Sequence, residues 1–359
     1  MTISEKLEEE RMGTKPILGI TMGDPAGCGP EITVKALSSK NIYDLCNPIV
    51  IGDANVIKDA IRIVGAKNIT INKINDITDA KSQFGIVDVY HLDLVEMSKH
   101  EYGKVSEMAG EAAFQCVKKV IELAMDGKID ATITNPLNKE ALNLAGHHYS
   151  GHTEIYAELT GTTNYSMMLA LENLRVVHVS THVSLREACD RVKKQRVYDV
   201  IKIADDTCKK MGIENPKIGV AGLNPHSGEN GLFGTEEKNE IEPAIIMAKA
   251  EGINVDGPVP PDSIFSKAIG GWYDIVVAMY HDQGHIPLKV VGFVYDREAK
   301  KWGSVSGVNI TLGLPIIRSS VDHGTAFEVA GQGTANETSL INAIQYGVQL
   351  VNDNQIPSK

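Results

Sequence analysis

Short apolar runs alternate along the chain with longer stretches of helical periodicity, and this alternation constrains the fold more than any other feature. The clearest helical stretch is residues 110–125, in which apolar side chains recur at intervals of three and four residues. The apolar runs are residues 17–20, 48–51, 86–90, 131–134, 167–171, 176–179, 218–221 and 275–279. Strands that alternate with amphipathic helices predict an α/β protein with parallel or mixed sheets covered by helices.

Size and composition exclude several classes of protein. The 359 residues suffice for two domains or one large α/β unit. Acidic residues outnumber basic ones 46 to 35, and the net charge of −11 argues against nucleic acid as a partner. No apolar run approaches about 18 residues, so we expect no membrane span, and the charged N-terminal segment does not resemble a secretory signal. Five cysteines, an odd number without a C-x-x-C pair, indicate reduced thiols in a cytoplasmic protein.

Three segments are expected to be irregular. Residues 1–14 are interpreted as a tail or a short exposed helix. Residues 254–261, NVDGPVPP, have the composition of a loop, and residues 294–307 form a polar insertion between apolar segments.

Three histidines directly follow predicted strands. His182, His226 and His281 each lie a few residues beyond an apolar run. Because ligands gather at the carboxyl ends of parallel strands, these side chains could converge on one divalent metal with an open coordination position. Each histidine alone could instead serve only as a hydrogen-bonding group in its loop. Asp282 could accept a hydrogen bond that orients the neighbouring imidazole, or it could be a helix N-cap, and the N-cap is the preferred interpretation.

A second set of side chains has the composition of an anion-binding site. His152 and Thr153 lie at a predicted helix start, where backbone N–H groups point outward. Lys289, Asn309 and Arg318 lie near apolar strands further along the chain. An ammonium, an amide and a guanidinium suit a phosphate monoester or a phosphate with a carboxylate, although most Lys and Arg side chains are simply surface charges.

The glycine-rich turn at residues 23–29, GDPAGCG, links the first predicted strand to a helix with Pro30 in its first turn. Its glycines lack the G-x-G-x-x-G spacing of the dinucleotide fingerprint, and no Lys-Ser/Thr pair follows as in a P-loop. An NAD site in this chain would therefore have to be of a non-Rossmann type.

Several segments occur in an order that is typical of one enzyme family. They are GITMGDPAGCGPEI (19–32), GHTE (151–154), STH (180–182), GLNPHSGENG (222–231), GPVPPDS (257–263), AMYHDQGH (278–285) and GVNITLGLPIIRSSVDHGTA (307–326). From about residue 15 to the C-terminus, the chain closely resembles the 4-hydroxythreonine-4-phosphate dehydrogenase family.

This resemblance implies a fold similar to that of the isocitrate and isopropylmalate dehydrogenases, with two α/β/α lobes, a central cleft and a non-Rossmann NAD site. One lobe would comprise residues 1–135 and 322–359, and the other, with metal and dimer-interface elements, residues 136–321. The implied cofactors are NAD and a divalent metal (Zn, Mg, Co, Ni or Mn). The implied partners are a phosphorylated small-molecule substrate and a second copy of the chain, in a homodimer with shared active sites.

The resemblance also implies roles for individual residues. His182, His226 and His281 match the metal-binding histidines of the family, with His281 supplied by the partner subunit. The positions that match substrate-binding residues are His152, Thr153, Lys289, Asn309 and Arg318. The expected catalytic residues are Lys289, His281 and Asp262. The general base is left open between Lys289, Lys139 and metal-bound hydroxide.

One departure from the family pattern bears on the substrate. Residues 294–306 separate Gly292-Phe293 from Gly307-Val308-Asn309, whereas the usual pattern connects them almost directly. The longer segment resembles a second branch of the family, which acts on four-carbon sugar acids. The expected reaction is therefore NAD- and metal-dependent oxidation at C3 and decarboxylation of D-threonate or D-erythronate 4-phosphate, which gives dihydroxyacetone phosphate.

Four other functions are kept as alternatives. The first is the 4-hydroxythreonine-4-phosphate dehydrogenase reaction of pyridoxal 5'-phosphate synthesis, and the second is oxidation of cis-dihydrodiols. A metal-dependent phosphohydrolase is disfavoured because no carboxylate-rich two-metal cluster accompanies the histidines. A non-catalytic metabolite sensor is disfavoured because the three histidines and the anion-binding residues are all present.

Overall fold

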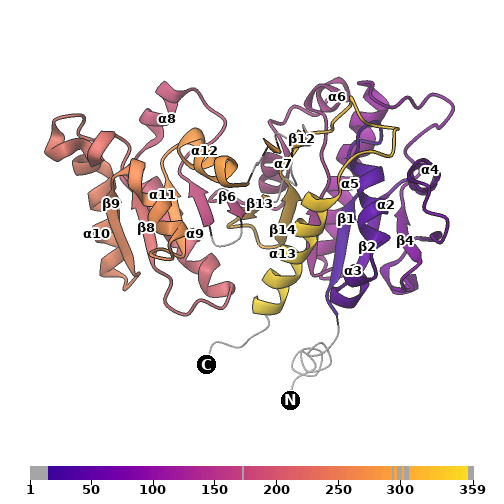
Figure 1. The fold of residues 1–359 in the computed structure, drawn as a ribbon, viewed down its shortest axis with the longest axis horizontal. Helices are drawn as coiled ribbons and strands as arrows, with labels where there is room; N and C mark the ends of the chain where they lie inside the picture. Colours follow the sequence, from indigo (N-terminus) through magenta and orange to yellow (C-terminus); the bar gives the residue numbers. More distant parts are fainter. Residues whose placement is uncertain (1–14, 172–173, 293–294, 297–300, 303–306, 355–359) are drawn as a thin grey trace, which may run out of the picture. The chain divides into compact units, whose positions relative to one another are not determined.

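The computed structural model describes residues 15–171, 174–292, 295–296, 301–302 and 307–354 (Figure 1). Each predicted apolar run coincides with a β-strand to within two residues at its ends. The predicted helix 110–125 lies within α5 (Glu107–Met125), whose N-cap Ser106 accepts a hydrogen bond from the Ala109 N–H. The prediction of an α/β protein is confirmed.

The chain forms two compact units. Met1–Ile155 with Ile316–Lys359 make up the first, and Tyr156–Pro315 make up the second. The lobe boundaries expected from the sequence, after residues 135 and 321, stay a prediction.

The first unit contains a fully parallel sheet in the order β3-β4-β2-β1-β5-β14. Its strands are β1 (Ile17–Thr21), β2 (Asn47–Gly52), β3 (Thr70–Ile74), β4 (Ile86–His91), β5 (Ala131–Thr134) and β14 (Ile317–Val321). Its helices are α2 (Gly29–Leu37), α3 (Lys40–Leu45), α4 (Ala54–Val64), η1 (Ile77–Asp79), α5, α6 (Lys139–Leu144) and α13 (Thr338–Asn354).

Helices cover both faces of this sheet. A Cβ atom placed on Gly19 of β1 would lie 2.7 Å from Val120 of α5, whereas one placed on Gly347 of α13 would lie 3.9 Å from Leu18. Successive residues of a strand point to opposite faces, so α5 and α13 lie on opposite sides of β1. Figure 1 shows the yellow helix α13, from the C-terminal part of the chain, packed beside the indigo elements of the N-terminal part. The first unit is therefore an α/β/α sandwich.

The second unit contains a mixed sheet in the order β13-β6-β7-β10-β8-β9. Its strands are β6 (Ser166–Leu171), β7 (Leu174–His178), β8 (Ile218–Ala221), β9 (Val255–Val259), β10 (Ile275–Ala278) and β13 (Val308–Leu312). Its helices are α8 (Leu185–Arg191), α9 (Lys194–Lys210), η2 (Pro225–Gly231), η3 (Glu237–Ile241), α10 (Glu242–Ala250), α11 (Pro261–Ile269) and α12 (His281–Gly292). Strands β7, β10, β8 and β9 are parallel, and β6 is antiparallel to both of its neighbours. Helix α7 (His152–Leu159) spans the boundary between the two units in the sequence.

The interpretation of residues 254–261 as a loop was wrong. Residues 255–259 form β9, the last strand in the order of the second sheet, and α11 begins directly afterwards at Pro261. The pairing of β9 with β8 contains a register shift. Proline is tolerated at sheet edges and at bulges because no ladder hydrogen bond is lost there. Pro258 therefore suggested a loop, although Val255 and Val259 favour a strand.

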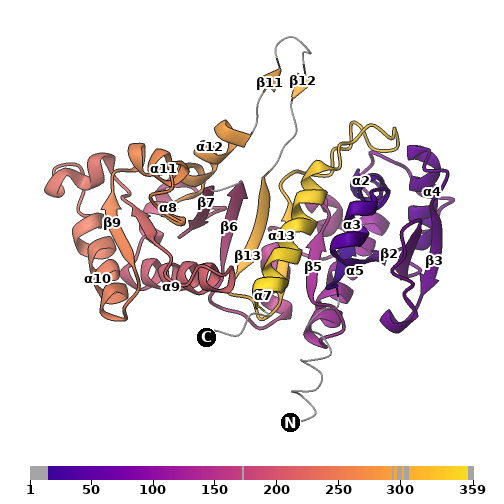
Figure 2. The ribbon, with the colours of Figure 1, turned by 60° about the horizontal axis from the view of Figure 1, so that its bottom comes forward.

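The polar insertion is described only in part. Residues 295–296 and 301–302 form the short antiparallel pair β11–β12, with Tyr295 opposite Trp302 (Figure 2). The rest of residues 294–306 and the predicted N-terminal tail lie outside the described residues.

Two further predictions concern the whole chain. Within the part of the chain that the structure describes, no helix is both long enough and apolar enough to cross a bilayer. All five cysteines are free thiols, of which four are buried and Cys189 is half-buried.

Candidate active site

The three histidines predicted as metal ligands follow three neighbouring strands of the second unit. His182 follows β7, His281 begins α12 after β10, and His226 lies in η2 after β8. Strand β10 lies between β7 and β8 and is parallel to both. Parallel strands present their carboxyl ends at one edge of a sheet, so the three loops leave the sheet at the same edge.

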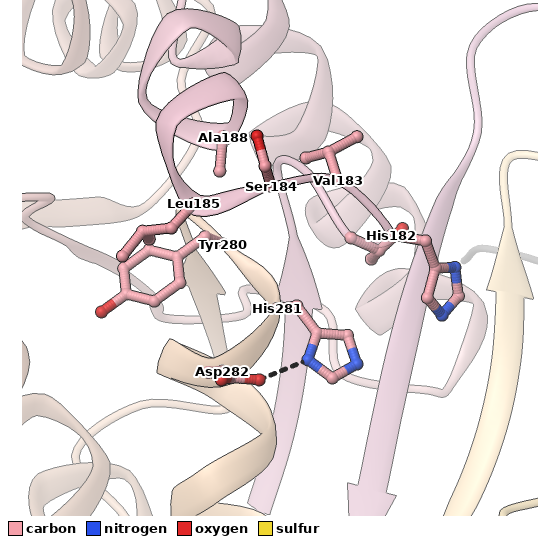
Figure 3. Close-up of a pocket in the computed structure, with 9 residues that line it drawn as sticks. His182, Val183, Ser184, Leu185, Ala188, Tyr280, His281 and Asp282 are labelled. Atoms are coloured by element: carbon pink, nitrogen blue, oxygen red, sulfur yellow. Dashed lines mark hydrogen bonds and ion pairs between the residues drawn. The ribbon is translucent and has the colours of Figure 1, made fainter.

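Two of these histidines lie close together. The ring centroids of His182 and His281 are 5.7 Å apart. Both side chains line a pocket of ≈430 Å³, whose other lining residues come from the segments 181–188 and 280–282. Figure 3 shows the two imidazole rings beside each other, with Tyr280 and Leu185 further along the pocket wall.

The imidazole of His281 is held by its neighbours on α12. Its Nδ1 lies 2.7 Å from Asp282 Oδ1 (Figure 3). The ring of His285 stacks on it with centroids 3.6 Å apart, and His285 Nδ1 donates a hydrogen bond to the His281 carbonyl oxygen at 2.9 Å. The interpretation of Asp282 as an N-cap was wrong, since Asp282 lies inside the first turn of α12 and its carboxyl group bonds the imidazole. A carboxylate on Nδ1 leaves Nε2 as the ring nitrogen that can ligate a metal.

Two buried histidines of this region were not predicted from the sequence. The His285 ring lies 4.8 Å from that of His178, which donates from Nδ1 to the Met167 carbonyl oxygen at 3.2 Å. Burial, together with the charge of neighbouring imidazoles, lowers the pKa of His178 to about 3 and that of His285 to about 4. The spacing of four residues between His281 and His285 could have indicated that both lie on one helix face. No sequence pattern indicated a role for His178, which lies in a strand.

The structure brings together part of the predicted metal-ligand set. His226 is exposed, and its ring lies 6.4 Å from that of Phe233. Among the residues described here, no three His, Cys, Asp or Glu side chains form a group that could hold a metal. The paired imidazoles of His182 and His281 suit a divalent metal that accepts nitrogen ligands, and the loop on the neighbouring strand carries His226.

Part of the predicted anion-binding set lies together in the first unit. Arg318 of β14 is only 3% exposed, which excludes the interpretation of this residue as a surface charge. Its Nη2 donates to Thr134 Oγ1 at 3.0 Å and its Nη1 to Thr153 Oγ1 at 3.5 Å. Pairing of β14 with β5 brings Arg318 to Thr134, and the start of α7 supplies Thr153.

His152 adds an unsatisfied polar atom to this group. Its Nε2 is buried and has no hydrogen-bond partner among the described residues. Burial, and then the charge of Arg318, lower the pKa of His152 well below its usual value, so that the imidazole is neutral. A buried polar atom without a partner beside a guanidinium marks a place where a ligand oxygen could bind.

The remaining predicted residues lie elsewhere. Lys289, on α12, and Asn309, on β13, are half-buried in the second unit, where Asn309 Nδ2 lies 3.0 Å from Met167 Sδ. Asp262, in the first turn of α11, and Lys139, at the start of α6 in the first unit, are exposed. The predicted anion-binding set is thus divided between the two units.

The glycine-rich turn carries a buried carboxyl group that the sequence did not single out. Asp24 Oδ1 accepts a hydrogen bond from the Ala26 N–H at 2.8 Å, and burial raises the pKa of Asp24 to about 6. In the same turn, the Cys28 sulfur lies 3.8 Å from the Gly324 carbonyl oxygen. The turn therefore contacts the segment that follows β14.

Two features define an α/β enzyme. In one unit, paired imidazoles lie at the ends of parallel strands. In the other unit, a guanidinium, an imidazole and hydroxyl groups are buried together. Residues 44–347 match the model of the family described as pyridoxal phosphate biosynthetic protein PdxA. The chain belongs to this family.

Its relatives cover nearly the whole chain. The D-threonate 4-phosphate dehydrogenase of Salmonella typhimurium is 48% identical over 339 residues, which are 94% of this chain and 100% of the relative. The D-threonate 4-phosphate dehydrogenase of Cupriavidus necator is 46% identical over 336 residues, which are 93% of this chain and 97% of the relative. A crystal structure of a 4-hydroxythreonine-4-phosphate dehydrogenase from Burkholderia phymatum matches with a TM-score of 0.82 and 46% identity, covering 94% of this chain and 99% of that one. The resemblance inferred from the sequence motifs is confirmed.

Proposed function

We propose that this chain is an NAD- and metal-dependent dehydrogenase that acts on D-threonate 4-phosphate or D-erythronate 4-phosphate. The C3 hydroxyl is oxidised as the C3 hydrogen leaves with its electron pair and the hydroxyl proton leaves separately. The resulting 3-keto acid loses its carboxylate as CO2, and protonation at C2 gives dihydroxyacetone phosphate. The names of the relatives support this class of substrate, and the buried group around Arg318 is the observation that carries the proposal.

Arg318, Thr153 and His152 bind the phosphate of the substrate. A guanidinium held by two threonine hydroxyls is oriented before the ligand arrives, which reduces the entropy lost on binding. The unsatisfied His152 Nε2 provides a further polar contact. Lys289 and Asn309 bind the other oxygens of the substrate, as the family positions of these residues indicate.

His182, His226 and His281 hold the divalent metal, with His281 oriented by Asp282 and His285. When bound, the metal supplies a Lewis acid that lowers the pKa of the substrate hydroxyl and stabilises the negative charge that develops as CO2 leaves. NAD supplies the hydride acceptor. Zn, Mg, Co, Ni and Mn remain the candidate metals, and imidazole nitrogens disfavour Mg.

Lys289 takes the proton of the substrate hydroxyl. It follows His281 and His285 at successive intervals of four residues on α12, so that the three side chains lie along one face of the helix. Lys139 is the alternative base and is exposed. Asp262 stays a predicted catalytic residue.

The enzyme acts as a homodimer in the cytoplasm, and α12 forms part of the dimer interface. Ile286, Val290 and Val291 expose apolar side chains on this helix, which begins with His281. An apolar helix face of this kind is costly in water unless a partner covers it. Contact between two copies along α12 would bring His281 of one subunit to the other subunit's active site.

Replacing Val290 with lysine is expected to convert the dimer to a monomer. Val290 is 72% exposed, so the free chain tolerates the charge, but burying an unpaired ammonium in an interface is unfavourable by several kcal/mol. Light scattering after size-exclusion chromatography measures the mass. Ile246→Lys is the matched control, because Ile246 is 65% exposed on α10 and lies outside the proposed interface. If the Val290→Lys protein remains dimeric, α12 does not form part of the interface.

The reaction is tested by following NADH formation by absorbance with purified, metal-loaded protein. D-threonate 4-phosphate, D-erythronate 4-phosphate and 4-hydroxythreonine 4-phosphate are compared under identical conditions. We expect one of the sugar-acid phosphates to give the highest kcat/KM. A preference for 4-hydroxythreonine 4-phosphate would contradict the proposal and support the alternative activity, the one for which the Burkholderia phymatum protein is named. Phosphate release without NADH formation would support a phosphohydrolase instead.

A further inference from the structure

One buried carboxyl group in the second unit has no role in the proposed reaction. Glu237, the first residue of η3, is 1% exposed. Its Oε1 accepts hydrogen bonds from the Leu223 N–H at 2.8 Å and the Asn224 N–H at 2.7 Å. Its Oε2 accepts a third from Asn224 Nδ2 at 2.9 Å. All three bonds go to the segment that connects β8 to η2.

The loop held by Glu237 has an unfavourable backbone conformation. His226, Ser227, Gly228, Glu229 and Asn230 have φ values of 50°, 52°, 79°, 43° and 60°. Residues other than glycine rarely adopt positive φ, and a residue that does so persists only where surrounding contacts impose the conformation. The loop therefore requires fixed contacts from outside itself.

The approach of Glu237 to this loop is close. A Cβ atom placed on Gly228 would lie 2.7 Å from Glu237 Oε2, so only glycine fits beside the carboxyl group. Element η3 is a π-helix, an uncommon conformation that occurs frequently at functional sites. Glu236, the preceding residue, accepts from the same Asn224 amide at 2.8 Å. Two consecutive side chains thus hold the base of the loop.

We propose that Glu237 is the positioning residue of His226. Its carboxyl group fixes residues 223–224 and thereby imposes the left-handed conformation that holds the His226 imidazole in place for the metal. This inference rests on the proposed function, in which His226 is a metal ligand. Charge-assisted hydrogen bonds are the strong ones among hydrogen bonds, and three of them converge on one buried group.

The test compares Glu237→Gln with Glu240→Gln. The first substitution keeps the shape of the side chain but sets an amide NH2 against Asn224 Nδ2. The second makes the same change within η3, at a carboxyl group that accepts from the Lys194 N–H at 2.7 Å and makes no bond to the His226 loop. Two quantities are measured for each: hydrogen exchange of the amides in residues 223–231, and Co²⁺ affinity by titration calorimetry. The thermal unfolding midpoint is recorded alongside.

In Glu237→Gln we expect loop amides to exchange about 10-fold faster and Co²⁺ to bind about 10-fold to 100-fold more weakly, while Glu240→Gln changes neither. A merely structural glutamate would lower the unfolding midpoint without a selective loss of metal affinity. Unchanged loop exchange would overturn the proposal. So would faster exchange with unchanged Co²⁺ affinity.

Two further variants keep the test decisive. If Glu237→Gln does not fold, Asn224→Ala removes only the two side-chain bonds, to Glu236 and Glu237, and keeps both backbone bonds to Glu237. It should give smaller changes in the same direction, whereas no change would overturn the proposal. His226→Ala tests the metal-ligand assignment separately from the role of Glu237. If His226→Ala leaves Co²⁺ affinity unchanged, the metal-ligand assignment in the proposed function is wrong, and the role of Glu237 towards the metal is wrong with it. Faster loop exchange in Glu237→Gln would still show that the carboxyl group holds the loop.

Discussion

Replacing Arg318 with alanine is expected to lower kcat/KM for the phosphorylated substrate by about 100-fold to 1,000-fold, as loss of one partner of a buried charge pair costs about 3–4 kcal/mol. Arg318 is buried and is held by Thr134 and Thr153, so neither a surface charge nor bulk water can replace it. The loss should appear mainly in KM, because a phosphate remote from the reacting carbon is bound equally in the ground state and the transition state.

The control for this prediction is the dephosphorylated acid. With D-threonate as substrate, Arg318→Ala should change kcat/KM by less than about 5-fold, since the guanidinium has no phosphate to bind. Arg175→Ala is the matched variant, because Arg175 donates to the Asp274 carbonyl oxygen at 3.2 Å in the second unit. It should affect both substrates equally. An equal effect of Arg318→Ala on both substrates would show that Arg318 does not bind the phosphate.

At a substrate concentration well below the KM of Arg318→Ala, two variants that are each inactive alone are expected to regain activity when they are mixed. His281→Ala and Arg318→Ala subunits each lack one side chain of the proposed site. If His281 acts in the partner's site, one site of every mixed dimer contains both side chains. Random exchange of subunits in a two-fold dimer then recovers about a quarter of the wild-type activity. His281→Ala alone should lose about 1,000-fold in kcat, which corresponds to ~4 kcal/mol of lost stabilisation.

The structure makes this experiment decisive, because His182 and His281 of the same chain lie 5.7 Å apart. If the two histidines ligate one metal within a single chain, mixed dimers contain two defective sites and remain inactive. Subunit exchange is verified by mixing dimers that carry different affinity tags. Adding Val290→Lys to both variants should abolish any recovery, provided that α12 forms the interface.

The strands that carry the site were predictable because they are buried on both faces. The runs that became β8 and β10 consist of apolar residues and glycine, and the run that became β7 is interrupted only by His178, which is the pattern of a covered parallel sheet. Strands β3, β9, β13 and β14 were absent from the predicted apolar runs, and β3 and β9 lie at the two ends of the strand order. An edge strand is packed on fewer sides, so its sequence tolerates polar residues, glycine and proline.

The residues that orient the site were less predictable than those that act in it. His182 and His281 could be selected by residue type and by position after a strand, and Arg318 by residue type near an apolar strand. Thr134 could not, because its contact with Arg318 depends on the pairing of β5 with β14. Glu237 reaches the His226 loop only because the chain turns back through η3. Contacts of this kind follow from tertiary packing, and residue spacing along the sequence does not predict them.

The first unit is built from two segments of chain separated by the whole of the second unit, and this has a consequence for synthesis on the ribosome. Strand β14 and helix α13 complete the sheet that begins with β1, yet they are translated after residue 315. The second unit, which is continuous in sequence, has all of its strands available earlier. Domains fold as units during translation. One edge of β5 therefore stays unpaired until β14 has been synthesised. Arg318, which we propose binds the phosphate, is therefore among the last residues of the proposed site to enter the folded protein.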